Sequence, residues 1–459
     1  MSETGKKNYT MDLTEGSIIK KLILYSLPLM ASSMLQLMFN AVDVMVVGQF
    51  AGENSLAAVG SNGSITGLMT NLFTGLSVGT NVLVARYFAA KNEDKLRKAI
   101  HTSIVVSVIG GVCLAIFGVL MARQMLEWTQ SPAEVIDLAT VYLRIYFLGM
   151  PAITLYNFGA AVLRGVGDTK RPLYFLTFAG VVNLLLNLLF VIAFHWDVAG
   201  VAVATIISQA ISAGLVLRCL LRESGAIRLE KQYLRIDGPL MVEILKIGVP
   251  AGLQSSMFSL SNTVVQSSIN SFGNIIAAGN AAAQNVESFI AMSVKALSQA
   301  AVAFISQNVG AKRYDRIVKI VLTILAFAFL FDVFIGNAVY LCGEPLLGLY
   351  TTSSAVVAAG MIRVGSNCIP HFIYALMDVM AGVIRGLGYS VMPMVVALLG
   401  VCGFRMAWIQ MLSLNESWYT IENVYSAYPI SWTFTLLAHT ICFLVVWNHI
   451  KKKWRKSLL

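Results

Sequence analysis

Charged residues are scarce in this sequence of 459 amino acids. Only 12% are Asp, Glu, Lys or Arg, whereas 57% are hydrophobic and the mean hydropathy is +0.73. A soluble globular domain carries roughly 25% charged residues. Because this amount of charge cannot coat a water-facing surface of such size, the composition excludes an ordinary soluble protein and predicts a lipid environment.

The chain also lacks the motifs of a disulfide framework, a metal centre or an enzyme. Its six cysteines form no Cys-x-x-Cys pair, so we interpret them as free buried thiols. Its five histidines are scattered, without the spacing of a metalloenzyme. We therefore expect no cofactor, no resident metal and no enzyme activity. A gated channel stays an alternative, although no filter-like loop or ring-forming charge motif is visible.

Long apolar stretches recur along the chain. A bilayer core of about 30 Å needs about 20 apolar residues per crossing. The first stretch is too long for a signal peptide and has no cleavage site, so we interpret it as a membrane helix. The apolar pattern predicts twelve transmembrane helices, at residues 18–48, 55–88, 99–122, 132–163, 171–195, 198–220, 240–271, 276–308, 317–342, 354–385, 390–412 and 428–449.

Basic residues lie almost entirely on one side of these predicted helices. Of the 33 Lys and Arg residues, 28 fall in connections of one side, and the opposite connections hold only Arg123. The positive-inside rule then places both termini in the cytoplasm and requires an even number of crossings. We expect a multi-pass protein of a bacterial inner membrane. The positive charge is a topological signal, so we expect no nucleic-acid partner.

The second half of the sequence repeats the first. The block VLRGVGDTKRP at 162–172 aligns with VIRGLGYSVMP at 383–393, an offset of 221, and Asn40 matches Asn262 at 222. Each half holds six predicted helices, so both halves start on the same side. The expected fold is therefore an all-α membrane protein of two parallel six-helix repeats, with a pseudo-twofold axis along the membrane normal.

Five segments follow from this organisation. The halves are expected to form a cleft and to open alternately to either side. The segments are a cytoplasmic N-terminal tail at 1–17, an N-lobe at 18–220, a cytoplasmic linker at 221–239, a C-lobe at 240–449 and a basic tail at 450–459.

An acidic residue in the first predicted helix is the leading functional candidate. Ionisable groups at membrane depth are costly and therefore indicate function. Gln36, Asn40 and Asp43 follow helical spacing, which places them on one face. Asn183 and Asn187, four residues apart, could complete a polar cluster. We predict that Asp43 exchanges H⁺, or binds Na⁺, and attracts a cationic substrate when ionised; a purely structural acid is the alternative.

The second half offers several candidates for the substrate cleft. Glu287 and Lys295 lie on one helix face but about 12 Å apart by helix rise, too far for direct pairing. Pro28, inside the first helix, allows that helix to bend. For the C-lobe side chains, internal ion pairing is the alternative to a substrate role. The remaining cleft candidates are Gln36, Asn262, Gln266 and Asp378.

Several blocks resemble the multidrug and toxic compound extrusion (MATE) family. They are LPLMASSMLQLMFNAVDVMVVGQFAG, RGVGDTKRPLYF, AGVAVATIISQ, SQNVGAKRYDR and YPISW. The resemblance implies a lipid-embedded, monomeric exporter of small cationic drugs in exchange for H⁺ or Na⁺. It also implies that Asp43 is the helix 1 acid of the N-lobe cation site, with Asn183 beside it.

The sequence departs from the family pattern at one position of this site. Many bacterial members have an Asp where this chain has Asn187, so the resemblance implies a site with Asp43 alone. A flippase of the same superfamily, for a lipid-linked oligosaccharide, remains the alternative, although flippases commonly have fourteen helices. A major-facilitator permease is disfavoured because its loop signature is missing.

Overall fold

The computed structural model describes residues 9–129 and 131–456, which fold into helices with no strand among them. The first half contains α1 (Ile18–Phe50), α2 (Glu53–Ala89), α3 (Glu93–Trp128), α4 (Ile136–Leu148), α5 (Met150–Gly165), α6 (Lys170–Leu188), the π-helix η1 (Leu189–Ala193) and α7 (Asp197–Arg222). Short 3₁₀ turns η2 (Gly225–Ile227) and η3 (Lys231–Tyr233) follow. The predicted linker is therefore the irregular stretch between α7 and α8.

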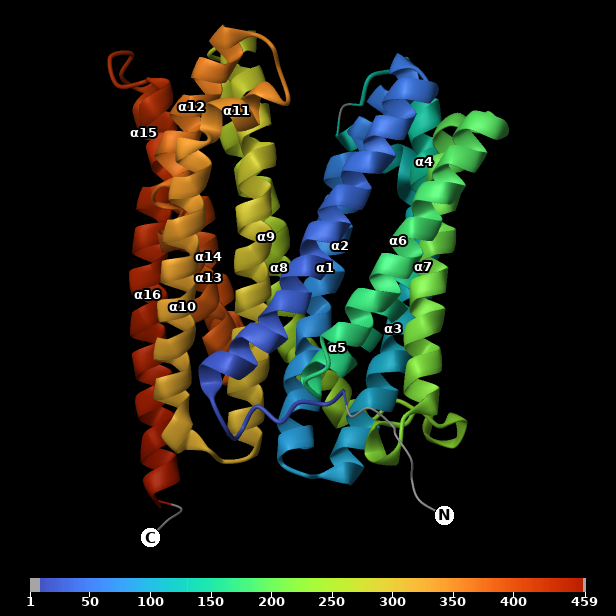
Figure 1. Cartoon of the computed structure of the whole chain (residues 1–459), viewed down its shortest axis with the longest axis vertical. Coiled ribbons are helices and arrows are strands. Elements are labelled where there is room, and N and C mark those ends of the chain that lie inside the picture. Colours follow the sequence, from blue (N-terminus) through green and yellow to red (C-terminus); the bar gives the residue numbers. More distant parts are fainter. Residues whose placement is uncertain (1–8, 130, 457–459) are drawn as a thin grey trace. The chain divides into compact units, whose positions relative to one another are not determined.

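The second half repeats this order (Figure 1). It contains α8 (Gly238–Asn270), α9 (Asn274–Gly310), α10 (Tyr314–Leu341), α11 (Gly343–Gly348), α12 (Ser354–Cys368), α13 (His371–Gly386), α14 (Val391–Ala397), the π-helix η4 (Leu398–Gly403), α15 (Phe404–Ser413) and α16 (Ile421–Lys456). The apolar pattern does not predict the short helix α11, because its six residues are too few to form a long apolar stretch.

Two predicted helices are bent pairs. α4 and α5 meet at 46°, and α12 and α13 meet at 45°. Pro151 lies in the first turn of α5, and Pro370 directly precedes α13. A proline lacks the N–H that would continue the preceding helix, which explains why both breaks occur at these equivalent positions.

Nine helices among the described residues are long and apolar enough to cross a membrane, or up to 11 spans if each bent pair is one. α8 is long enough but is not among them. Its second half carries Gln254, Asn262, Gln266 and Asn270, which lower its apolar character. The all-helical membrane fold is confirmed, whereas the number of twelve crossings stays a prediction.

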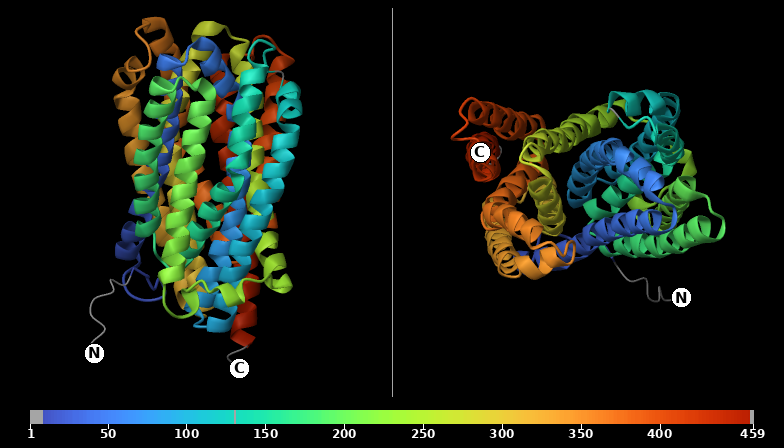
Figure 2. Two further views of the ribbon diagram at one scale, coloured as in Figure 1. Left: turned by 90° about the vertical axis from the view of Figure 1, so that its right-hand side faces the viewer. Right: turned by 90° about the horizontal axis from the view of Figure 1, so that it is seen from above.

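Many large apolar side chains are exposed on the helices. Leu120 on α3, Phe334 on α10 and Leu444 on α16 are 73%, 72% and 52% exposed. In water such surfaces would favour aggregation, whereas in a bilayer they face lipid tails of the same polarity. The helices within each unit run along a common direction, as the two views of Figure 2 show.

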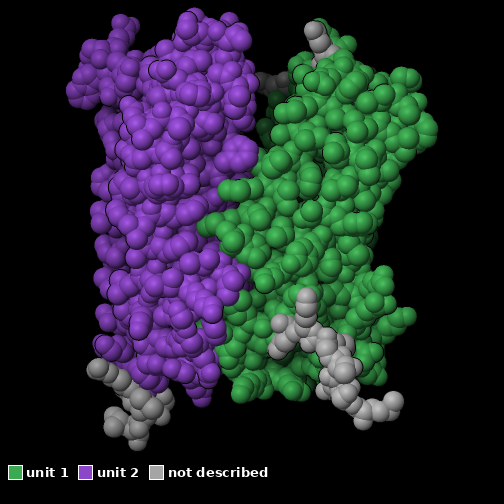
Figure 3. Space-filling view, viewed as in Figure 1, with its two compact units in different colours: residues 1–13, 27–252 green, residues 14–26, 253–459 purple. Residues whose placement is uncertain are grey.

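The described chain divides into two compact units. Unit 1 comprises residues 1–13 and 27–252, and unit 2 comprises residues 14–26 and 253–459 (Figure 3). The division therefore falls inside α1, next to Pro28, and inside α8, close to Pro250. The first part of each of these two helices belongs to a different unit from the rest of the helix. The units therefore differ from the predicted lobes, which are divided at the linker.

Glycines allow the first part of α8 to pack closely against α2 within unit 1. A Cβ atom on Gly75 would lie 2.3 Å from Cα of Gly252, and one on Gly79 would lie 2.1 Å from the carbonyl oxygen of Ile244. Gly75 and Gly79 are four residues apart, as are Gly248 and Gly252. This small-xxx-small pattern is a common way for membrane helices to approach.

The two chain ends meet the same end of unit 2. Arg316, near the start of α10, donates to the carbonyl of Gly16, which precedes α1. Tyr314, at the start of α10, packs against Trp454 near the end of α16, with ring centroids 5.6 Å apart. α1 therefore starts, and α16 ends, on one side of the unit, as an even number of crossings requires.

Candidate functional site

Asp43 lies at the centre of a polar cluster in unit 1. The Nδ2 atom of Asn187 donates to Asp43 Oδ1 at 2.5 Å and to Asn183 Oδ1 at 3.2 Å. The Thr205 hydroxyl on α7 is a polar neighbour of Asp43 and accepts from Asn183 Nδ2 at 3.5 Å. α1, α6 and α7 therefore each supply one wall of the cluster, in which Asn187 bonds to Asp43 directly and Asn183 is linked to it through Asn187.

The face of α6 that meets α1 explains this arrangement. Gly180, Asn183 and Asn187 are spaced by three and four residues, so they lie on one side of the helix. A Cβ atom on Gly180 would lie 1.9 Å from the Phe39 ring, which shows how closely α6 approaches α1. The missing side chain at Gly180 lets Asn187, two turns later, reach Asp43, with Asn183 bonded to Asn187.

The surroundings of Asp43 contain no ion-pair partner among the described residues. Val46 and Val47 on α1 and Val191 on η1 belong to the apolar core next to it. An ionised carboxylate is costly in such surroundings unless hydrogen bonds or a cation compensate it. The site can therefore hold a charge only with the help of neutral donors or of a bound cation.

Gln36 and Asn40 do not join the cluster. Both side chains are exposed, and neither bonds to Asp43 in the described part of the chain. Asn40 and Asp43 are three residues apart, but Asp43 turns toward α6 while Asn40 stays on the open side of α1. The expected polar face on α1 is present, but only its third member enters the bonded site.

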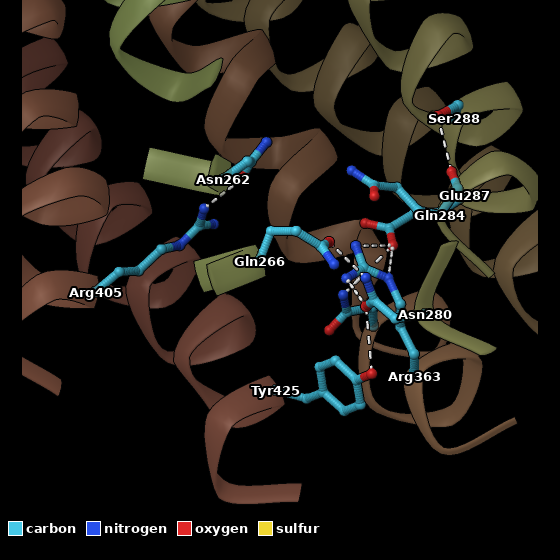
Figure 4. A network of polar contacts seen from close by, with 10 residues as sticks. Asn262, Gln266, Asn280, Gln284, Glu287, Ser288, Arg363, Arg405 and Tyr425 are labelled. Atoms are coloured by element: carbon cyan, nitrogen blue, oxygen red, sulfur yellow. Dashed lines mark hydrogen bonds and ion pairs between the residues drawn. The ribbon is translucent and has the colours of Figure 1, made fainter. Parts of the chain in front are cut away.

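A second polar cluster fills unit 2 and contains an ion pair (Figure 4). Nη2 of Arg363 on α12 lies 2.7 Å from Oε2 of Glu287 on α9, and Nε donates to the same oxygen at 3.0 Å. Nη1 donates to Asn280 Oδ1 at 2.7 Å, and Asn367 donates to Glu287 at 3.4 Å. Glu287 is therefore a paired residue, the alternative weighed for it from the sequence.

The two polar residues predicted on α8 join this network from its edge. Gln266 accepts from Asn280 Nδ2 at 2.6 Å and donates to Asn270 at 2.8 Å. Asn262, one turn earlier, accepts from Nη1 of Arg405 at 2.9 Å. Figure 4 shows Asn262 and Gln266 between the guanidinium groups of Arg405 and Arg363.

Lys295 on α9 and Asp378 on α13 stay outside this network. No ion pair within 4 Å joins the two groups among the described residues. Both are partly exposed. Lys295 does not reach Glu287, as the spacing of eight residues predicts.

The sequence is similar to a known family of proteins. A sequence model described as MatE matches residues 28–189 and 250–409. The chain belongs to the MATE family. It is 27% identical to the probable multidrug resistance protein YoeA of Bacillus subtilis, over 98% of this chain and 96% of YoeA. It is 30% identical to the probable multidrug resistance protein YpnP of the same species, over 67% and 68% of the two chains.

A solved structure supports the fold of this MATE chain. The crystal structure of MATE in complex with MaL6 superposes with a TM-score of 0.91 at 18% identity, covering 97% of this chain and 100% of the other. MATE proteins are membrane transporters and not enzymes. These matches favour a transporter of this family over the lipid-linked oligosaccharide flippase.

The MATE sequence model also confirms the internal repeat, because it matches the chain twice. Its matches begin at residues 28 and 250, which are 222 apart, the offset between Asn40 and Asn262. With offsets of 221 and 222, Asn183 corresponds to position 404 or 405. Asn262 in unit 2 therefore stands where Asn40 stands in unit 1, and Arg405 lies at or next to the position equivalent to Asn183.

Sequence reasoning missed several members of both clusters in this MATE protein. Thr205, Asn280 and Asn367 are single polar residues on apolar helices, and such residues commonly join helices without any other role. Arg363 and Arg405 lie within predicted helices, but spacing along one helix does not reveal their partners. The buried pair of His371 and Asp332, 2.9 Å apart, joins α13 to α10 and likewise depends on packing between helices.

Proposed function

We propose that this MATE protein exports small amphipathic or cationic organic compounds and takes up H⁺ in exchange, with Asp43 as the coupling group. One observation carries the proposal. Asp43 is a carboxyl group at membrane depth whose hydrogen-bond partner Asn187 and polar neighbour Thr205 are both neutral. The names of its relatives, which describe multidrug resistance proteins, support export of drug-like compounds.

Exchange follows from competition for one carboxylate. The N–H of Asn187 and the hydroxyl of Thr205 stabilise the ionised form, and the apolar wall stabilises the neutral form. A cationic compound or a proton can each neutralise the charge, but the two cannot do so together. Binding of one therefore releases the other, which is the requirement for antiport.

The chemistry of the cluster favours H⁺ over Na⁺. A hard cation needs several oxygen ligands. Asp43 supplies the only carboxylate of the described cluster, Asn187 points its N–H group at it, and the Asn183 oxygen already accepts from Asn187. A second acid at position 187 would add oxygen ligands, but this chain has none there. A proton needs only the carboxylate itself.

We propose that α1 couples this exchange to a change of shape. α1 passes from unit 2 to unit 1 next to Pro28, so a bend there moves the part that carries Asp43. Because Pro28 has no N–H, the carbonyl four residues earlier lacks its usual helical donor. The Ser32 hydroxyl donates to the Pro28 carbonyl at 2.8 Å, a side-chain bond of the kind that often accompanies bent helices. Protonation of Asp43 weakens its bonds to Asn187 and Thr205 and frees α1 to bend.

The proposed setting is a bacterial inner membrane with both termini in the cytoplasm and the protein acting as a monomer. The basic connections support this orientation through the positive-inside rule. Several of these connections lie together in unit 1, where the linker backbone at Glu230 donates to His101 at 3.0 Å near the start of α3. Met11, close to the N-terminus, donates to Val166 at 3.1 Å, just beyond α5.

Transport in reconstituted vesicles tests the proposal. The full chain is placed in vesicles loaded with a cationic fluorescent dye, and a pH gradient or a sodium gradient is imposed separately. We expect dye movement with the pH gradient and none with the sodium gradient alone. Movement driven by sodium alone would reassign the coupling ion, and dye movement that neither gradient changes would remove antiport altogether.

A further inference from the structure

We propose that unit 2 contains an anion-binding subsite centred on Arg405, which takes the carboxylate or phosphate group of an organic substrate. The observation behind it is a buried guanidinium whose partners are all uncharged. Arg405 is 2% exposed, and it donates to Asn262 Oδ1 at 2.9 Å and to Ser431 Oγ at 3.0 Å. The proposal rests on the transport function proposed above and specifies part of its substrate.

The contrast with Arg363 shows what Arg405 lacks. Arg363 is equally buried, but two of its nitrogens bond to the Glu287 carboxylate. No carboxylate lies within ion-pair distance of Arg405 in the described chain. Its described bonds use Nε and Nη1, and they leave the Nη2 group without a described partner. A guanidinium is suited to bind a carboxylate or phosphate through two parallel N–H groups.

The two arginines also share one aromatic ring. The guanidinium carbon of Arg405 lies 4.3 Å from the centre of the Tyr428 ring, and that of Arg363 lies 5.1 Å from it. Two positive groups therefore sit beside one tyrosine with Glu287 as the nearby carboxylate. Both guanidinium groups are buried, and Glu287 is ion-paired with Arg363 and not with Arg405, so this part of unit 2 has a surplus positive charge.

The other carboxylates of unit 2 do not pair with Arg405. Glu287 is paired with Arg363, and Asp332 is bonded to His371. Asp378 forms no ion pair within 4 Å among the described residues, and Arg385 donates to the neutral amide of Gln254 at 2.8 Å. No carboxylate of the described chain therefore neutralises Arg405 by an ion pair.

Asn262 is the group that an incoming anion would replace. Its side chain is partly exposed, whereas Arg405 lies behind it and is buried. An amide oxygen carries no net charge, whereas a carboxylate or phosphate adds ion-pair attraction and can accept from two N–H groups of one guanidinium. An anion arriving beside Asn262 can therefore take over its bond to Nη1 and also bond to Nη2.

Binding of two matched dyes tests the subsite. One is a zwitterionic rhodamine with a free carboxylate, and the other is its ethyl ester, which is purely cationic. Affinities are measured by fluorescence polarisation on the full chain in discs of neutral lipid. In Arg405→Gln we expect the carboxylate dye to bind about tenfold more weakly and the ester to bind as before. Arg405→Lys should restore part of the loss, and exposed Arg144→Gln should change neither dye.

Asn262→Ala gives an independent test that does not remove the charge. Loss of the competing amide should strengthen binding of the carboxylate dye several-fold without strengthening that of the ester. Equal weakening of both dyes in Arg405→Gln, or no change for the carboxylate dye in both variants, would overturn the proposal. If Arg405→Gln does not fold, the Asn262→Ala result decides alone.

Two controls separate the possible sources of failure. Discs that contain phosphatidylglycerol show whether a lipid phosphate competes with the dye. Competition that disappears in Arg405→Gln would assign the subsite to lipid and overturn the substrate assignment. Because dye binding in discs needs no gradient, loss of gradient-driven transport would refute the proposed antiport without affecting this test.

Discussion

The polar clusters of the two units hold charges of opposite sign on corresponding pairs of helices. In unit 1 the charged member is Asp43 on α1, and Asn187 on α6 bonds to it. In unit 2 the charged member is Arg405 on α15, and Asn262 on α8 bonds to it. The charge therefore lies on the first helix of the pair in unit 1 and on the other helix in unit 2, and the bonded residues do not occupy equivalent positions of the repeat.

The comparison teaches that the repeat preserves the arrangement of the helices but not the polar residues placed on them. Both charges are held by neutral amides, so each unit retains a charge that a mobile partner can compensate. Unit 2 also contains the Glu287–Arg363 pair, whereas the Asp43 cluster holds no ion pair among the described residues. We therefore expect loss of function from changes in the first cluster, and loss of stability from changes in the ion pair.

The largest expected effect on transport comes from removing the charge of the unit 1 cluster. Asp43→Asn keeps the shape of the side chain but removes its titration and its charge. Gradient-driven export should fall to the level of empty vesicles, while the protein still inserts and folds. Asn40→Ala, on the exposed face of the same helix, is the matched control and should retain most transport. Full retention of export in Asp43→Asn would exclude this carboxylate from coupling.

Removing the ion-pair partner of Glu287 in unit 2 should lower the stability of the protein. Arg363→Met leaves a carboxylate without its guanidinium, and breaking a buried ion pair in this way costs about 3–5 kcal/mol. Thermal unfolding in detergent should therefore occur at a clearly lower temperature, and Glu287→Gln added to the first change should restore part of the loss. Exposed Arg144→Met serves as control. An unchanged unfolding temperature would mean that the pair is not formed.

A smaller change tests how closely α6 must approach α1. Gly180→Ala places a methyl group into the Phe39 ring, and overpacking of this kind costs about 1–3 kcal/mol. Unfolding temperature and transport should both fall, and Phe39→Leu should relieve part of the effect. Gly214→Ala on α7 is the control, since nothing lies within 4 Å of the added Cβ atom. If Gly180→Ala and Gly214→Ala have the same unfolding temperature and transport, the close approach of α6 to α1 contributes to neither property.

The smallest expected effect changes the charge balance of the first cluster. Asn187→Asp places a second carboxylate beside Asp43 and adds oxygen ligands for a hard cation. We expect part of the export to become driven by a sodium gradient, which the vesicle assay measures directly. Asn187→Ser, which shortens the side chain without adding charge, should not gain this response. Equal sodium responses in both variants would show that the residue at position 187 does not determine the coupling ion.

The sequence predicted helices and repeats well because both depend on local pattern. Apolar runs and the matching blocks at 162–172 and 383–393 do not require knowledge of the fold. The association of Asp43 with Asn187 was also predictable, because polar residues on apolar helices seek one another. The absence of Asn40 from this cluster depends on which face of α1 is turned toward α6. The pattern of residues along one helix does not contain this information.

Partner choice in unit 2 could not be predicted from spacing. Glu287 and Lys295 share a helix face, but the observed partner of Glu287 is Arg363, 76 residues away on α12. The neutral partners of Arg405 are likewise brought to it by α8 and α16, over 143 and 26 residues. Such pairs depend on tertiary packing, which helical periodicity along one segment does not contain.

Proton release on ligand binding is the most direct measurement of the central claim, that one carboxylate holds either a proton or a cation. Purified protein in weakly buffered detergent is titrated with the cationic rhodamine ester while a pH indicator records released protons. The account predicts proton release by the unaltered protein and none by Asp43→Asn under conditions where both bind dye. Equal release by the two proteins would contradict it.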